Sequence, residues 1–174
     1  LMDEPLSNLD YNLKSNLRSM IRKLLKKFKT TAVIVTHDII DAMEMSDEII
    51  VIDKGKVIQK GPPDEIYNNP ISKKVALLFG KTNFIPLKMV PDSKNYFFDD
   101  ETKESWISIR PNQFIIYDEI TKYKGKIYIG KIKSVKRLAS ELKLELKCDN
   151  LLLNISLNTL TELFVGQELK VIIP

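Results

Sequence analysis

A run of mostly β-branched residues at 31–36, Thr-Ala-Val-Ile-Val-Thr, constrains the fold more than any other feature of this sequence. Such a run, without alternation of polar and apolar residues, is typical of a strand buried on both faces in a parallel sheet. Residues 11–29 carry apolar side chains at helical spacing, which predicts an amphipathic helix capped by Asp10 or Asn8. A second buried strand is expected at 48–53. The first half of the chain is therefore expected to be α/β.

The hydrophobic pattern changes near residue 82. From there onward, apolar residues recur at every second position in short segments that are separated by polar turns. Leu142, Leu144 and Leu146, for example, alternate with charged residues. A series of short strands of this kind predicts a small barrel or sandwich. We therefore expect two domains, an α/β domain over residues 1–82 and an all-β domain over residues 83–174.

Three polar side chains that suit phosphate chemistry lie at the ends of predicted strands. Asp3 and Glu4 follow an apolar pair at the start of the sequence, and His37 follows the run 31–36. The carboxyl ends of strands in an α/β sheet converge on one crevice, so these side chains can share a site. An adjacent acid pair suits hydrolysis of a Mg-nucleotide, because one carboxylate organises the metal shell and the other activates water. A solvated strand end is the alternative explanation for the acid pair.

These residues resemble a known family. The segment Leu-Met-Asp-Glu-Pro at 1–5 resembles the Walker B motif of ABC transporter ATPases, Ser-Asn-Leu-Asp at 7–10 resembles their D-loop, and Val-Thr-His-Asp at 35–38 resembles their switch-histidine loop. Residues 41–70 follow the order and spacing of the subgroup that drives bacterial importers for maltose, polyamines, sulfate or ferric iron. Segments at 82–84 and 108–111 resemble parts of that subgroup's C-terminal regulatory domain, called TOBE or OB-like.

The resemblance implies a fold and a role for each site residue. The fold would be the C-terminal part of a P-loop ATPase domain followed by an OB-like barrel. Asp3 would hold Mg²⁺ through water, and Glu4 would be the general base. His37 would contact the γ-phosphate and hold the attacking water, and Asp10 would face the partner subunit. In-line attack on a phosphoryl group needs positioning and charge neutralisation more than covalent help, so these roles are chemically reasonable.

The resemblance also implies cofactors and partners for the full-length subunit. ATP and Mg²⁺ would be the cofactors, and two ATPase subunits would form a homodimer. The dimer would bind integral membrane permease subunits and lie peripherally on the cytoplasmic face of the cell membrane. A small-molecule or protein regulator would act at the β domain. The single cysteine, Cys148, cannot form an internal disulfide, which fits a reducing cytoplasm.

Two glycine-rich elements of such an ATPase do not occur in these 174 residues. Gly-Lys-Thr at 80–82 resembles the end of a phosphate-binding loop, but Val75 stands where the first glycine is required. The ABC signature needs adjacent glycines, and none of the six glycines adjoins another. We therefore expect this polypeptide to be inactive alone. We also expect residues 1–60, whose strands lack sheet neighbours, to self-associate or to be partly disordered.

Three other functions are alternatives at this point. A non-transport ATPase of the same superfamily, as in DNA repair or translation, is disfavoured, because such relatives do not normally carry the Glu-Ile-Tyr segment at 65–67 and Pro70 followed by this β domain. The β domain can be a regulatory module that senses a ligand or partner and acts on the ATPase half. An OB-like barrel can also bind single-stranded nucleic acid through aromatic side chains gathered on one face. The aromatic residues here are scattered, and acidic residues lie among the basic ones despite a net charge of +4. We therefore expect no nucleic-acid partner.

Overall fold

The computed structural model of this chain describes residues 1–117 and 125–173. Its contacts divide the chain into two compact units, the first being Leu1–Tyr67 and the second beginning at Asn68. The division by contacts falls before the sequence-predicted boundary at residue 82, and that boundary between family domains stays a prediction. No helix within the described part of the chain is long and apolar enough to cross a bilayer.

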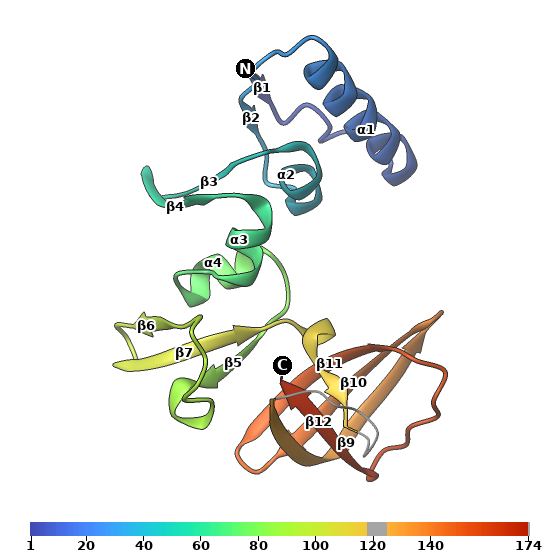
Figure 1. The fold of residues 1–174 in the computed structure, drawn as a ribbon. Helices are drawn as coiled ribbons and strands as arrows, with labels where there is room; N and C mark the ends of the chain where they lie inside the picture. The colour runs from blue at the N-terminus through green and yellow to red at the C-terminus, as the bar shows by residue number, and fades with distance from the viewer. Residues whose placement is uncertain (118–124, 174) are drawn as a thin grey trace. The chain divides into compact units, whose positions relative to one another are not determined.

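The first unit mixes helices with two small sheets (Figure 1). Its elements are β1 Met2–Asp3, α1 Tyr11–Lys27, β2 Ile34–Val35, α2 Ile39–Met45, β3 Ile49–Asp53, β4 Lys56–Gly61 and α3 Pro63–Asn68, which ends one residue beyond the unit. β1 pairs with β2 in parallel, and β3 pairs with β4 as an antiparallel hairpin. The α/β character predicted for this region is confirmed.

Helix α1 begins where the sequence provides a cap. The Asp10 carboxylate accepts a hydrogen bond from the backbone N–H of Leu13 at 3.0 Å, which satisfies one of the unpaired donors of the first turn. Lys26 and Lys27 lie in the last turn, where positive charge is favoured by the helix dipole. Of the two predicted caps, Asp10 is therefore the one used.

The run at 31–36 is less buried and less regular than its sequence predicts. Only Ile34–Val35 forms a strand, and Val33 and Val35 are 60% and 50% exposed. The reason is that β2 pairs only with β1 among the described residues, so one edge and much of its apolar surface face solvent. Burial also alternates along β3, where Ile50 and Ile52 are exposed. The prediction of strands buried on both faces is wrong for this structure. The expected self-association or partial disorder of residues 1–60 stays a prediction.

In its described residues, the second unit contains one whole helix and two antiparallel sheets. Its elements are α4 Lys73–Leu78, β5 Asn83–Pro86, β6 Phe97–Asp99, β7 Glu104–Ile109, β8 Ile115–Ile116, β9 Lys126–Leu138, β10 Glu141–Cys148, β11 Leu151–Asn158 and β12 Glu168–Ile173, with 3₁₀ turns at Leu87–Met89 and Pro111–Gln113. The sheet orders are β5-β7-β6 and β11-β10-β9-β12-β8. In the described residues β11 and β8 are the edges of an open five-stranded sheet, and an OB-like barrel stays a prediction.

The core of the second unit follows the period-two pattern of its strands. Leu142, Leu144 and Leu146 of β10 are buried, whereas Lys143 and Lys147 are exposed and Glu145 is half-buried. A buried amide joins the two sheets, since Asn83 of β5 donates to the backbone carbonyl of Asn154 on β11 at 2.8 Å. The backbone N–H of Asn154 donates in turn to the Asn83 side-chain oxygen at 2.7 Å. Packing and this reciprocal pair together fix the smaller sheet on the larger one.

The Gly-Lys-Thr segment at 80–82 follows a helix and leads into a strand. Gly80 lies just beyond the end of α4 with a φ of 105°, a conformation that glycine adopts without strain. Asn83, which follows the segment, begins β5. A phosphate-binding loop has the opposite order, because it leads from a strand into a helix. The geometry therefore agrees with the sequence argument against a phosphate loop at this place.

Gly130 on β9 leaves no space for a side chain. A β-carbon built there would lie 2.5 Å from the backbone oxygen of Lys147 and 2.6 Å from the Cys148 sulfur. Burial, and secondarily the charge of Asp149, raises the pKa of the Cys148 thiol to about 11, so this neighbour is a neutral, buried group.

We expect Gly130→Ala to lower the free energy of unfolding of the second unit by about 1–3 kcal/mol, because the obstructing backbone oxygen belongs to a paired strand. Urea denaturation followed by fluorescence of Trp106, the only tryptophan and a residue of β7, measures this change. Lys131→Ala, at an exposed position on the same strand, is the control and should change stability by less than about 0.5 kcal/mol. Equal stability of Gly130→Ala and the parent would contradict the steric argument.

Candidate active site

Glu4 and His37 meet at the carboxyl ends of β1 and β2. The parallel register aligns Asp3 with Val35, so both strands end at the same level. The Nδ1 atom of His37 lies 2.7 Å from Oε1 of Glu4, and the side chains are 77% and 44% exposed. With Nδ1–H donating to Oε1 of the carboxylate, Oε2 of Glu4 and Nε2 of His37 are not used in this contact and can bind a water or a ligand. The structure thus brings together two of the predicted site residues, as the convergence of strand ends led us to expect.

Glu4 has a strained backbone. Its φ is 41°, in the left-handed region that non-glycine residues rarely occupy. The chain turns there at the end of β1, and the turn is closed by a hydrogen bond from the Ser7 N–H to the Glu4 carbonyl at 3.2 Å. Such a conformation costs about 1–3 kcal/mol and is frequent at functional sites. The strained residue is the one that contacts His37, which favours a functional role for this pair.

Asp38 holds the chain directly after His37. Its Oδ1 accepts from the backbone N–H of Ile40 at 2.9 Å and so caps α2, while its Oδ2 lies 3.2 Å from Lys14 Nζ. Burial disfavours the charged form, but hydrogen bonds from Lys14 and from the α2 backbone outweigh it and lower the pKa of the Asp38 carboxyl. Asp38 is therefore ionised at neutral pH. The sequence offered a signal for this cap that our prediction did not use, namely an aspartate just before a helical segment.

The other two predicted site residues have separate positions. Asp3 ends β1 and is exposed, and Asp10 caps α1. Among the described residues, no three or more His, Cys, Asp or Glu side chains gather as a metal site. Mg²⁺ is usually bound by one or two carboxylates together with waters and substrate phosphates, so a single exposed aspartate is a fitting donor. Asp3 directly precedes Glu4 in the sequence. The proposed metal-binding role of Asp3 and the proposed interface role of Asp10 stay predictions.

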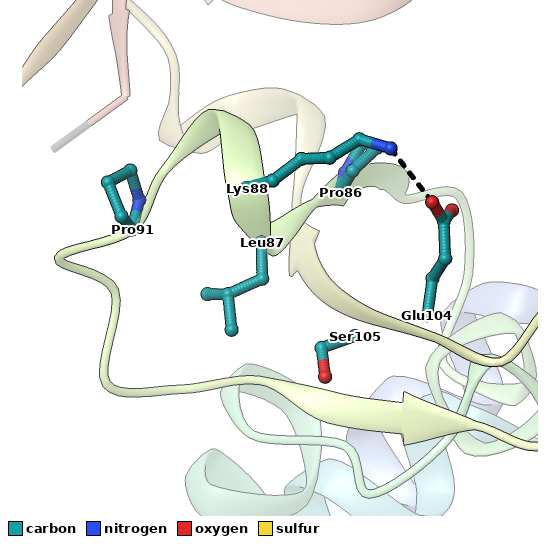
Figure 2. Close-up of a pocket in the computed structure, with 6 residues that line it drawn as sticks. All are labelled: Pro86, Leu87, Lys88, Pro91, Glu104 and Ser105. Atoms are coloured by element: carbon teal, nitrogen blue, oxygen red, sulfur yellow. Dashed lines mark hydrogen bonds and ion pairs between the residues drawn. The ribbon is translucent and has the colours of Figure 1, made fainter.

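A cleft of about 350 Å³ lies in the second unit, between the segment after β5 and the start of β7. Its lining residues are Pro86, Leu87, Lys88, Pro91, Glu104 and Ser105 (Figure 2). An ion pair of 2.8 Å between Lys88 and Glu104 spans one side. Figure 2 shows the Leu87 side chain between the two segments, with the Ser105 hydroxyl near it. The cleft offers an apolar floor with one charged edge, which suits a small amphipathic group.

Comparisons with known proteins identify relatives of one kind. The chain is 36% identical over 142 residues to the spermidine/putrescine import ATP-binding protein PotA of Malacoplasma penetrans, covering 74% of this chain and 23% of that protein. It is 40% identical over 120 residues to the Fe(3+) ions import ATP-binding protein FbpC 1 of Pectobacterium atrosepticum, covering 64% and 34%. It is 35% identical over 159 residues to PotA of Clostridium acetobutylicum, covering 84% and 44%.

The matches cover most of this chain but only part of each relative. The chain spans less than half the length of the curated relatives that it matches. No family model matches it. The relatives nevertheless agree in kind, since each is named an import ATP-binding protein. The chain therefore belongs to the family of ATP-binding subunits of ABC importers and matches the C-terminal half of such a subunit.

Proposed function

We propose that this chain acts as the C-terminal part of the ATP-hydrolysing subunit of an ABC importer, which couples ATP binding and hydrolysis to uptake of a substrate across a membrane. The observation that carries the proposal is the 2.7 Å contact between Glu4 and His37 at the ends of two parallel strands. A carboxylate beside an imidazole, both open to solvent, can hold and deprotonate a water molecule next to a bound phosphate.

The roles proposed for the site follow from its chemistry. Glu4 is the general base, and its Oε2 accepts a proton from the attacking water while Oε1 keeps its contact with His37. His37 uses its Nε2 side to contact the γ-phosphate. Asp3 binds Mg²⁺ through water, and the metal supplies charge neutralisation for the phosphates. Asp10 faces a second copy of the ATPase subunit, in addition to capping α1.

The proposal extends to the partners and location of the whole subunit. We infer a homodimer that binds integral membrane permease subunits on the cytoplasmic face of the cell membrane. The family relationship supports this, because import ATP-binding proteins act with membrane components. The transported substrate is left open, since relatives named for spermidine and putrescine and for Fe(3+) ions match the chain to similar degrees.

The 174-residue polypeptide itself is proposed to be inactive, because no glycine-rich phosphate loop occurs in its sequence. A chimera tests both statements. Residues 1–174 replace the corresponding C-terminal part of the Clostridium PotA, with which the chain shares 35% identity over 159 residues. We expect the chimera to hydrolyse Mg-ATP, and the polypeptide alone to show no turnover above its Glu4→Gln variant. A folded chimera that binds ATP without hydrolysing it would refute the proposed function, and turnover by the polypeptide alone would refute its inactivity.

A second function is favoured by the cleft at Leu87. The second unit can act as a regulatory module, in which a small molecule or a protein segment enters this cleft and changes the activity of the ATPase part. The cleft is preformed, and the Lys88–Glu104 pair gives it a polar edge for orienting a ligand. Leu87→Trp fills the cleft, so this variant should abolish any effector response of the chimera and leave its basal ATP hydrolysis unchanged.

A further inference from the structure

Arg18 reverses the usual distribution of residues on an amphipathic helix. It is 3% exposed, whereas Met20 and Leu24 on the same helix are 50% and 45% exposed. Arginine is almost never fully buried unless it is paired. Its pair is Asp41 of α2, which is also 3% exposed and whose Oδ1 lies 2.6 Å from Arg18 Nε. The contact between α1 and α2 therefore includes a buried ion pair, although apolar residues of α1 such as Met20 and Leu24 are left exposed. Figure 1 shows where the two helices lie in the first unit.

This pair belongs to a cluster of four residues, Lys14, Arg18, Asp38 and Asp41, which we call the α1–α2 ionic cluster. Arg18 Nη2 lies 3.9 Å from Asp38 Oδ2, and Lys14 Nζ lies 3.2 Å from the same oxygen. Two cations from α1 therefore face two carboxylates at the start of α2, and Arg18 Nη1 also lies 3.6 Å from Oε2 of Glu44, an exposed residue further along α2. Apolar residues of similar volume often stabilise a protein as well as a buried ion pair does, so we assign this cluster to fixing the arrangement of α1 on α2 and not mainly to stability.

The α1–α2 ionic cluster contacts the residues on both sides of His37 in the sequence. Asp38 follows the histidine; it accepts a hydrogen bond from Lys14 and makes a longer ionic contact with Arg18. Thr36 precedes it, and its hydroxyl donates to Asp41 Oδ2 at 3.5 Å and accepts from the Asp38 N–H at 3.0 Å. His37 itself makes none of these contacts and is exposed. The residues before and after His37 are thus both linked to the buried guanidinium of Arg18 on α1, Thr36 through Asp41 and Asp38 by its own contact.

We propose that Arg18 is a positioning residue for His37. Through Asp41 and Asp38 it fixes the segment 36–38, and this sets the approach of the imidazole to Glu4. The catalytic consequence rests on the proposed function, but the positioning itself is a property of this chain. Arg22 is the natural comparison, because it also joins α1 to the end of α2, donating to the carbonyls of Glu44 and Ser46 at 2.8 and 3.1 Å, away from His37.

The test uses the imidazole nitrogen signals of His37, the only histidine, in the 174-residue chain. In the parent, Glu4→Gln should shift the Nδ1 resonance, because the partner of Nδ1 changes from a carboxylate to a neutral amide. We expect this Glu4-dependent shift to fall at least threefold in Arg18→Met and in Arg18→Lys, whose single ammonium cannot span Asp38 and Asp41. It should persist in Arg22→Met. An unchanged Glu4-dependent shift in Arg18→Met would overturn the proposal.

Two further readouts separate positioning from folding and from the proposed function. Loss of the dispersed amide signals of residues 1–67 in both Arg18 variants would also overturn the proposal, since Arg18 would then support the fold as a whole. In the chimera, Arg18→Met should lower kcat about tenfold with KM for ATP unchanged, because Arg18 has no contact with nucleotide in this scheme. An inactive chimera combined with an Arg18-dependent nitrogen shift would refute the proposed function and leave the positioning role standing.

Discussion

Glu4→Gln in the chimera is expected to reduce ATP turnover by about 10²–10⁴-fold, the usual contribution of a general base. Glutamine keeps the size of the side chain and a hydrogen-bond acceptor for His37, so the 2.7 Å contact with Nδ1 can persist. What is lost is the ability to take a proton from water. KM for ATP should change little, because Glu4 is proposed to act on water and not on the nucleotide. Steady-state phosphate release measures both constants.

Glu48→Gln is the matched control for this prediction. The Glu48 side chain is 53% exposed and lies 3.0 Å from Lys60, so Glu48, like Glu4, is an accessible glutamate of the first unit with one side-chain partner. Its substitution should change turnover by less than about twofold, since exposed ion pairs contribute little. A Glu4→Gln chimera that keeps more than about a third of the parent activity would show that another group is the base.

Arg110→Met is expected to lower the free energy of unfolding of the second unit by about 3 kcal/mol or more. Arg110 is 1% exposed, and its Nη1 donates to the carbonyls of Ala76 and Gly80 at 3.0 and 3.2 Å. Ala76 lies in the last turn of α4 and Gly80 lies just beyond its end, where a cation is favoured by the helix dipole. Each hydrogen bond to a charged group contributes about 1.5–3 kcal/mol, and methionine fills the space without replacing either bond.

Arg137→Met provides the control, because Arg137 makes the same kind of contacts at the surface. It donates to the carbonyls of Thr159 and Thr161 at 3.0 and 3.1 Å, but it is exposed. Water can take over both carbonyls there, so the loss should stay below about 1 kcal/mol. Urea denaturation monitored through Trp106 compares the two variants in the intact chain. Equal losses would show that burial is not the source of the Arg110 effect.

The second unit was the more predictable part of the fold. The period-two pattern of its sequence matches its strands. Leu142, Leu144 and Leu146 alternate with lysines or glutamate, and this alternation predicted the strand β10, Glu141–Cys148. Short strands without such alternation, such as β6 at Phe97–Asp99, were not predicted, since a three-residue strand carries too little periodic signal. The run at 31–36 predicted a longer and more buried strand than the structure has. Its composition suits a strand with neighbours on both sides, and β2 has one.

The candidate site was predictable only in part. The meeting of Glu4 and His37 followed from the rule that parallel strand ends converge, which the β1–β2 register satisfies. Arg18 was not predictable, because an arginine among apolar residues of an amphipathic helix is expected on its solvent face. Only the packing of α1 on α2, which buries Arg18 with Asp41, reveals its position.

The most direct test of the account is a double-mutant cycle on Glu4 and His37 in the chimera, with kcat measured for the parent, Glu4→Gln, His37→Ala and the double variant. When two residues contact each other and act on the same water, removing the second adds little to the loss caused by removing the first. We therefore expect kcat of the double variant to lie within about threefold of kcat of the slower single variant. Losses that multiply, as for independent sites, would contradict the claim that this pair is one catalytic unit.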